Sequence, residues 1–171
     1  MKKITILLFA IGLLNSAMAQ ISEFTLPSVN LKSMDGKTIN TADIKNDGKP
    51  IIIDFWATWC KPCVMELTAI AENYSDWQTE TGVKLYAVSI DDSKSMNRVT
   101  PFVNGKGWEY EILLDPNSDF KRAMNVINVP HVFVVDGKGN VVYQHTTYAE
   151  GDEKLLLEVV RKVAKGEKLT E

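Results

Sequence analysis

One stretch near the middle of the chain constrains the fold more than any other. Residues 51–56 read Ile-Ile-Ile-Asp-Phe-Trp, and such a run is typical of a strand buried on both faces. The sequence Cys-Lys-Pro-Cys follows shortly after, from Cys60 to Cys63. Pro62 fits the first turn of a helix, where its missing N–H is not needed. The pattern predicts a buried strand that delivers two thiols to the start of a helix.

The predicted position makes the first thiol reactive. Backbone N–H groups without helical partners surround Cys60, and the positive end of the helix dipole favours thiolate over thiol. Cys63 lies one turn further on the same side of the helix. A permanent crosslink over so short a loop would stabilise little. We therefore expect Cys60 and Cys63 to form a reversible, redox-active disulfide, with Cys60 as the attacking thiol.

Residues 54–63 resemble the active-site segment of thioredoxins. The residues that match position by position are Trp59, Cys60, Pro62 and Cys63. Lys61 is a departure, since thioredoxins usually carry glycine there. From about Phe24 to the C-terminus the chain is similar to the TlpA/ResA-like branch of extracytoplasmic thiol–disulfide oxidoreductases. The resemblance implies an α/β thioredoxin fold with a mixed central β-sheet flanked by helices, an N-terminal hairpin and a central insertion.

Apolar periodicity and turn residues predict the other elements. The expected strands span 24–31, 38–40, 83–90, 110–114 and 140–146, and a further strand-like run within 126–136 opens at Pro130. Helical spacing follows Pro62 as far as Tyr74, and further helices are expected at 95–106, with a break near Pro101, at 118–124 and at 152–165. The acids Asp91 and Asp92, with Ser93, are expected to cap a helix rather than to bind metal.

Two further features concern the substrate and the proton. A proline that opens a strand is ordinary, but the resemblance implies a cis Val129–Pro130 bond against the cysteines. It also implies that Val129 and Pro130 bind substrate, together with Trp59 and Pro62.

Three isoleucines precede Asp54 and argue against a solvated acid, so we expect a buried carboxyl that takes the proton of Cys63. Glu66 matches a glutamate common in this branch, although an exposed first-turn acid explains it equally well.

Two alternatives use the same cysteines. His131 and His145 would lie opposite or diagonal across the 137–139 turn and could complete a Cys₂His₂ site, so a copper or zinc carrier is one alternative. A peroxiredoxin-like peroxidase is the other. It is weakened because Thr58 stands two residues before Cys60 rather than three, and no matching arginine is evident.

The first residues have the pattern of an export signal. Lys2 and Lys3 precede an apolar run, 4–14, and Ala17-Met18-Ala19 is a small-x-small cleavage site. We expect a signal peptide, 1–19, and a single thioredoxin-like domain, 20–171, in the periplasm or cell envelope. An uncleaved anchor is the less favoured reading, because the run is shorter than the roughly 20 apolar residues of a membrane span.

Composition limits the partners. The net charge is −3 and no basic run is present, so nucleic acid is not expected. The chain has two cysteines in total, which reserves cysteine for redox chemistry. We expect a monomeric reductase of disulfides in exported proteins, with cytochrome c maturation as one setting. It would require no cofactor or metal, and the resemblance implies a membrane-embedded dithiol protein as electron donor.

Overall fold

The computed structural model describes residues 24–169, so the predicted signal peptide, 1–19, lies outside the described residues. The strands are β1 (Asn30–Ser33), β2 (Thr38–Asn40), β3 (Ile51–Trp56), β4 (Lys84–Ser89), β5 (Glu111–Leu114), β6 (His131–Val135) and β7 (Val141–Thr146). The helices are α1 (Lys61–Ala71), α2 (Tyr74–Thr81), α3 (Val99–Lys106), α4 (Asp119–Ala123) and α5 (Asp152–Ala164), with short 3₁₀ turns at Thr41–Asp43 and Met96–Arg98.

The strands form one mixed sheet in the order β2-β1-β5-β4-β3-β6-β7. The central strands β3, β4 and β5 are parallel, whereas β6 runs antiparallel to β3. Parallel neighbours need crossover connections, and the helices between the strands provide them. The hairpin β1–β2 extends the sheet through antiparallel pairing of β1 with β5. The expected mixed α/β sheet and N-terminal hairpin are therefore confirmed.

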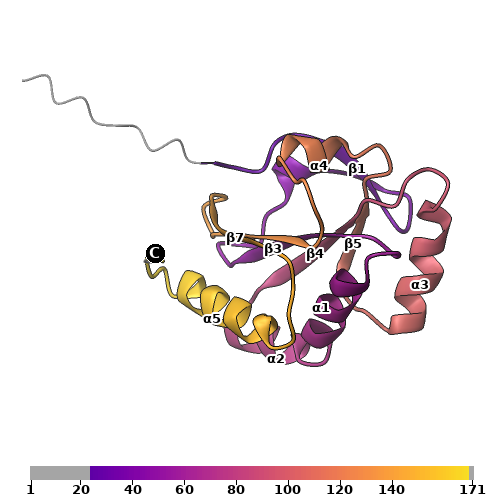
Figure 1. The fold of residues 1–171 in the computed structure, drawn as a ribbon. Coiled ribbons are helices and arrows are strands. Elements are labelled where there is room, and N and C mark those ends of the chain that lie inside the picture. The colour runs from indigo at the N-terminus through magenta and orange to yellow at the C-terminus, as the bar shows by residue number, and fades with distance from the viewer. Residues whose placement is uncertain (1–23, 170–171) are drawn as a thin grey trace, which may run out of the picture.

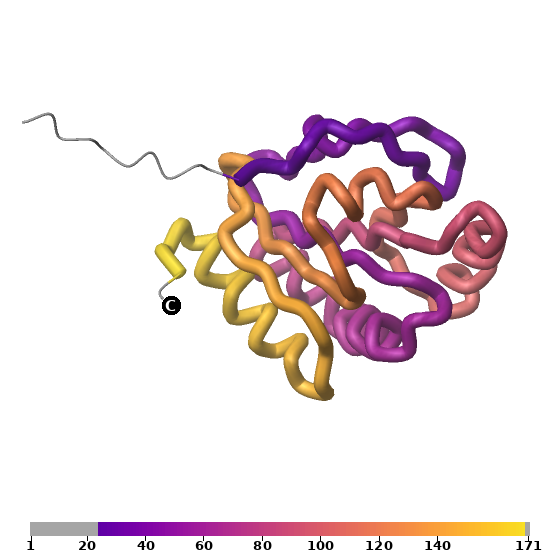
Figure 2. Tube along the Cα trace, turned by 45° about the horizontal axis from the view of Figure 1, so that its top comes forward, coloured from indigo at the N-terminus to yellow at the C-terminus, as the bar shows by residue number. Residues whose placement is uncertain are grey.

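Helices cover both faces of this sheet (Figure 1). On one face α1, α2, α3 and α5 pack over Ile52, Trp56 and Val132. On the other face α4 and the N-terminal segment pack over Ile53, Phe55 and Phe133. Figure 2 shows the N-terminal segment crossing the molecule on the side opposite α5. Every side chain of β3 is buried, as a strand in the middle layer requires.

The main differences from the expected elements concern the first strand, the active-site helix and the helix that contains Pro101, which begins at Val99 rather than at residue 95. The first strand begins at Asn30, and residues 24–29 contribute an isolated bridge at Thr25. The active-site helix ends at Ala71, and α2 then begins at Tyr74, whose ring packs edge-on against another tyrosine, with the ring centroids 4.8 Å apart. Pro101 does not break a helix, because it lies in the first turn of α3, where N–H groups have no helical partner.

None of the helices in the described part of the chain is long and apolar enough to cross a membrane.

Candidate active site

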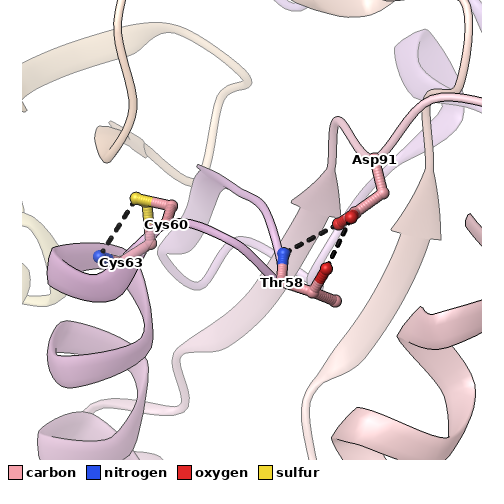
Figure 3. Close-up of a disulfide and its surroundings, with 4 residues drawn as sticks. All are labelled: Thr58, Cys60, Cys63 and Asp91. Atoms are coloured by element: carbon pink, nitrogen blue, oxygen red, sulfur yellow. Dashed lines mark hydrogen bonds between the residues drawn. A yellow bond between two sulfur atoms is a disulfide. The ribbon is translucent and has the colours of Figure 1, made fainter. Parts of the chain in front are cut away.

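The two cysteines lie where β3 passes into α1. Cys60 is the N-cap of α1, Pro62 lies in its first turn, and Cys60 and Cys63 form a disulfide (Figure 3). The backbone N–H of Cys63 also donates to the Cys60 sulfur at 3.3 Å. Cys63 is fully buried, whereas Cys60 retains 5% exposure. Cys60 is therefore the more accessible of the two cysteines, and an N–H group is in place to stabilise negative charge on its sulfur.

The loop before Cys60 is anchored to the next strand by Asp91. This carboxylate accepts the backbone N–H of Thr58 at 2.8 Å and the Thr58 hydroxyl at 2.6 Å (Figure 3). It also accepts the Ser89 hydroxyl at 2.9 Å. The expectation that Asp91 caps a helix is therefore wrong, whereas Asp92 does accept the N–H of Ser95 in the following turn. The Thr58 hydroxyl is committed to Asp91, which further weakens the peroxidase reading.

Apolar groups lie around the exposed edge of the disulfide. Trp59 is 66% exposed and Pro62 is also exposed. The Val129–Pro130 bond is cis, as the resemblance implied. Val129 packs against the core cluster that contains both cysteines, and Pro130 is buried at the entry to β6. The segment that follows β3, with Trp59 and Pro62, and the segment that precedes β6, with Val129 and Pro130, thus lie at the same end of these two paired strands.

Asp54 is a buried acid on the same side of the sheet as α1. Its side chain lies on the same face of β3 as those of Ile52 and Trp56, which pack into the cluster that contains Cys63. Its side chain has no exposed surface, and neither oxygen has a hydrogen-bond partner among the described residues. Burial raises the pKa of Asp54 well above its usual value, and the nearby Glu66 raises it further. The solvated-acid alternative is therefore wrong.

Glu66 is buried as well, so the exposed-acid account of this residue is wrong. Its side chain has 0% exposure, and its Oε1 lies 2.9 Å from Nε2 of His145, on β7. Burial raises the pKa of Glu66, while the His145 hydrogen bond opposes that shift. Sequence spacing gave one usable signal, since Cys63, Glu66 and Leu67 share a helix face. No local pattern predicts the contact with His145, which lies 79 positions away.

The two histidines lie on opposite faces of the sheet. His131 stacks on Phe133, with the ring centroids 4.3 Å apart, and its Nε2 lies 3.1 Å from Oε1 of Gln144. Burial lowers the pKa of His131. Because His145 turns to the α1 face instead, the two rings cannot close one site with the cysteines. Among residues 24–169 no three His, Cys, Asp or Glu side chains are grouped as a metal site.

The profile of the AhpC/TSA family matches residues 20–144. The chain is 32% identical to the thiol-disulfide oxidoreductase ResA of Bacillus subtilis, over 68% of this chain and 62% of that protein. It is 28% identical to the sporulation thiol-disulfide oxidoreductase A of the same organism, over 81% and 85% of the two chains.

A solved structure is more similar. The solution structure of a thioredoxin-like protein from Porphyromonas gingivalis is 57% identical, covers 82% of this chain and 92% of that chain, and has a TM-score of 0.74. The match to ResA spans less than two thirds of the length of that relative.

Proposed function

The chain belongs to the AhpC/TSA family of thioredoxin-like proteins, and from this premise we propose that it is an extracytoplasmic thiol–disulfide oxidoreductase that reduces disulfides in exported proteins. The observation that carries the proposal is the Cys60–Cys63 disulfide at the start of α1, with Asp54 buried on the same side of the sheet. The names of the ResA and sporulation relatives describe the same chemistry.

The proposed cycle begins with the reduced dithiol. The Cys60 thiolate attacks one sulfur of a partner disulfide, which forms a mixed disulfide and releases the other partner sulfur as a thiolate. The Asp54 carboxylate takes the proton of Cys63, and the Cys63 thiolate attacks the Cys60 sulfur. The second partner thiolate leaves and takes a proton from water. Two electrons pass to the partner, and the Cys60–Cys63 disulfide remains.

Substrate would bind at the apolar edge around Cys60. Val129 and Pro130, at the entry to β6, would hold an extended partner segment, and the exposed Trp59 and Pro62 would supply apolar surface beside it. No bound metal or organic cofactor takes part in this cycle. A membrane-embedded dithiol protein would return the electrons, and the enzyme would work as a monomer.

The export signal pattern at residues 1–19 supports a location in the periplasm or cell envelope. Outside the reducing cytosol, cysteines of exported proteins oxidise readily, so a reductase has substrates there. Apocytochrome c, in cytochrome c maturation, is one exported protein that needs reduced cysteines.

Substitution of the resolving cysteine tests this function. In Cys63→Ser the Cys60 thiol can still attack a partner disulfide, but no second thiol is present to resolve the mixed disulfide. Partners should therefore accumulate as mixed disulfides with Cys60, which a reducing agent cleaves. The variant would be purified from the cell envelope under acid quench and its partners identified by mass spectrometry. Cys60→Ser is the matched control and should trap nothing. Equal or absent trapping by the two variants would refute the mechanism.

The direction of electron flow can be measured separately. The helix dipole and the Lys61 cation stabilise the Cys60 thiolate and make the protein more oxidising, whereas the buried Asp54 favours completion of reductions. Lys61 is exposed, so water screens its effect. We expect a potential roughly between −270 and −120 mV. Equilibration with glutathione buffers measures it, and a value at the upper end would reverse the assigned direction.

A further inference from the structure

We propose that Glu66 and His145 form the path by which Asp54 loses its proton to solvent and so becomes the base for Cys63, with His145 as the residue that positions Glu66 and exchanges the proton with solvent. The inference rests on the proposed function, because it concerns the resolving step of that reaction. It assigns a role to His145, which the cycle described above does not use.

A buried base needs such a path. Asp54 has no exposed surface, and burial raises its pKa, so the carboxyl must release a proton before it can take the proton of Cys63. A charged or proton-carrying group cannot cross an apolar core unaided at low cost. The proton therefore requires a titratable side chain between Asp54 and the surface, and Glu66 is the acid whose charge acts on Asp54.

The contact between Glu66 and His145 has the geometry of a proton-transfer pair. The two side chains lie 2.9 Å apart, with 0% of Glu66 and 18% of the His145 side chain exposed. A neutral Glu66 can donate its O–H to Nε2, and an ionised Glu66 can accept an N–H from it. The same hydrogen bond thus serves both protonation states. It connects a sealed carboxyl on α1 to a ring on β7 that reaches solvent.

The two acids influence each other's ionisation without a hydrogen bond between them. Both oxygens of Asp54 and Oε2 of Glu66 have no hydrogen-bond partner among the described residues, and two buried carboxylates on one face of the sheet disfavour double ionisation. The pKa values of both acids are raised, in each case mainly by burial. When one acid gains a proton, the other can lose one at less cost. That coupling moves charge outward from the dithiol.

Other charged groups face Glu66 from α5 and the segment before it. Asp152 and Glu153, at the start of α5, raise the pKa of Glu66, whereas His145 lowers it. Tyr143 and Tyr148 also lie within its electrostatic reach, and the Tyr148 hydroxyl donates to Glu153 at 2.7 Å. In the described residues His145 is the group that favours the ionised form of Glu66. Its removal should therefore trap the proton on the acid pair.

Ellman's reagent, a small aromatic disulfide, separates the two steps of the reaction. Reduced protein mixed with one equivalent releases a first coloured thiolate when Cys60 attacks and a second when Cys63 resolves the mixed disulfide. In His145→Gln the amide can still hydrogen-bond to Glu66 but cannot exchange a proton. We expect an unchanged first phase and a second phase slowed by about 10- to 100-fold at pH 7. That second phase should accelerate with pH as hydroxide replaces the path.

The controls assign each outcome. His131→Gln changes the histidine on the other face of the sheet and should leave both phases at the wild-type rate. Thermal unfolding of His145→Gln measures any loss of packing. If His145→Gln keeps the wild-type second phase and its pH profile, the exit path is refuted while the proposed function stands. If wild-type protein shows no first phase, the proposed function itself fails.

Discussion

Asp54 shows how a single side chain can cost stability for the sake of chemistry. Its carboxyl group lies among Ile52, Trp56 and the underside of α1, without exposure and without a hydrogen-bond partner among the described residues. Glu66 and Tyr110 are the titratable groups that face it, and Glu66 raises its pKa further. An ionised carboxylate is poorly tolerated in such surroundings.

Asp54→Asn should therefore stabilise the protein, and more so at high pH. The unfolded chain releases the Asp54 proton at a lower pH than the folded protein, so wild-type stability falls as pH rises from the unfolded pKa toward the folded one. Each unit of difference between the two pKa values corresponds to about 1.4 kcal/mol. Urea unfolding at pH 5 and pH 8 measures the effect. A gap between variant and wild type that shrinks with pH would contradict it.

The same substitution should slow resolution without slowing attack. Asparagine cannot take the Cys63 proton, so the second phase with Ellman's reagent should fall on the order of 100-fold, while the first phase stays unchanged. This pairing of higher stability with lower activity is not expected from a residue that only fills the core.

The roles of some residues could be predicted from the sequence, and those of others could not, for a physical reason. Burial of Asp54 followed from its apolar neighbours along one strand, and the reactive place of Cys60 followed from Pro62. The role of Asp91 was misjudged and that of Glu66 stayed open, because each depends on a partner far along the chain, 33 and 79 positions away respectively. Local rules treat an acid near a helix start as a cap or a solvated group.

At the level of elements, the end of β4 supports the start of α1. Asp91 follows β4 and fixes the loop that joins β3 to Cys60 through two hydrogen bonds to Thr58. The carboxylate is 1% exposed, so these bonds are shielded from water and stronger than surface bonds. The loop therefore holds its shape independently of the disulfide that follows it.

Asp91→Ala should destabilise the protein by about 1 to 3 kcal/mol, because it leaves the N–H of Thr58 and the hydroxyl of Ser89 without this acceptor. Asp92→Ala, at the exposed neighbouring acid, is the control and should cost less, since water can replace its bonds to Ser95. Urea unfolding of both variants measures the difference. Equal losses would show that Asp91 acts as an ordinary turn acid.

At the scale of the whole molecule, the sheet forms a middle layer with a separate apolar cluster on each face. The sequence predicted this class because the β3 run is apolar on both sides, and because parallel strands need helical crossovers. It did not predict that the N-terminal hairpin joins the sheet beside β5, since pairing across about 80 positions leaves no local periodicity. The α1–α2 break escaped prediction for a similar reason: it turns Tyr74 toward Tyr110.

The near-complete burial of the dithiol has a consequence for timing. Cys63 has 0% exposure and Cys60 has 5%. A partner's sulfur must therefore lie on a flexible segment of backbone if it is to approach the Cys60 sulfur closely. Folded proteins rarely carry a disulfide on such a flexible segment, whereas a newly translocated chain that has not yet folded is flexible along its whole length. Under the proposed function, the enzyme would thus act on a substrate protein after export and before folding hides its cysteines, and the choice of substrates would depend on folding speed as much as on sequence.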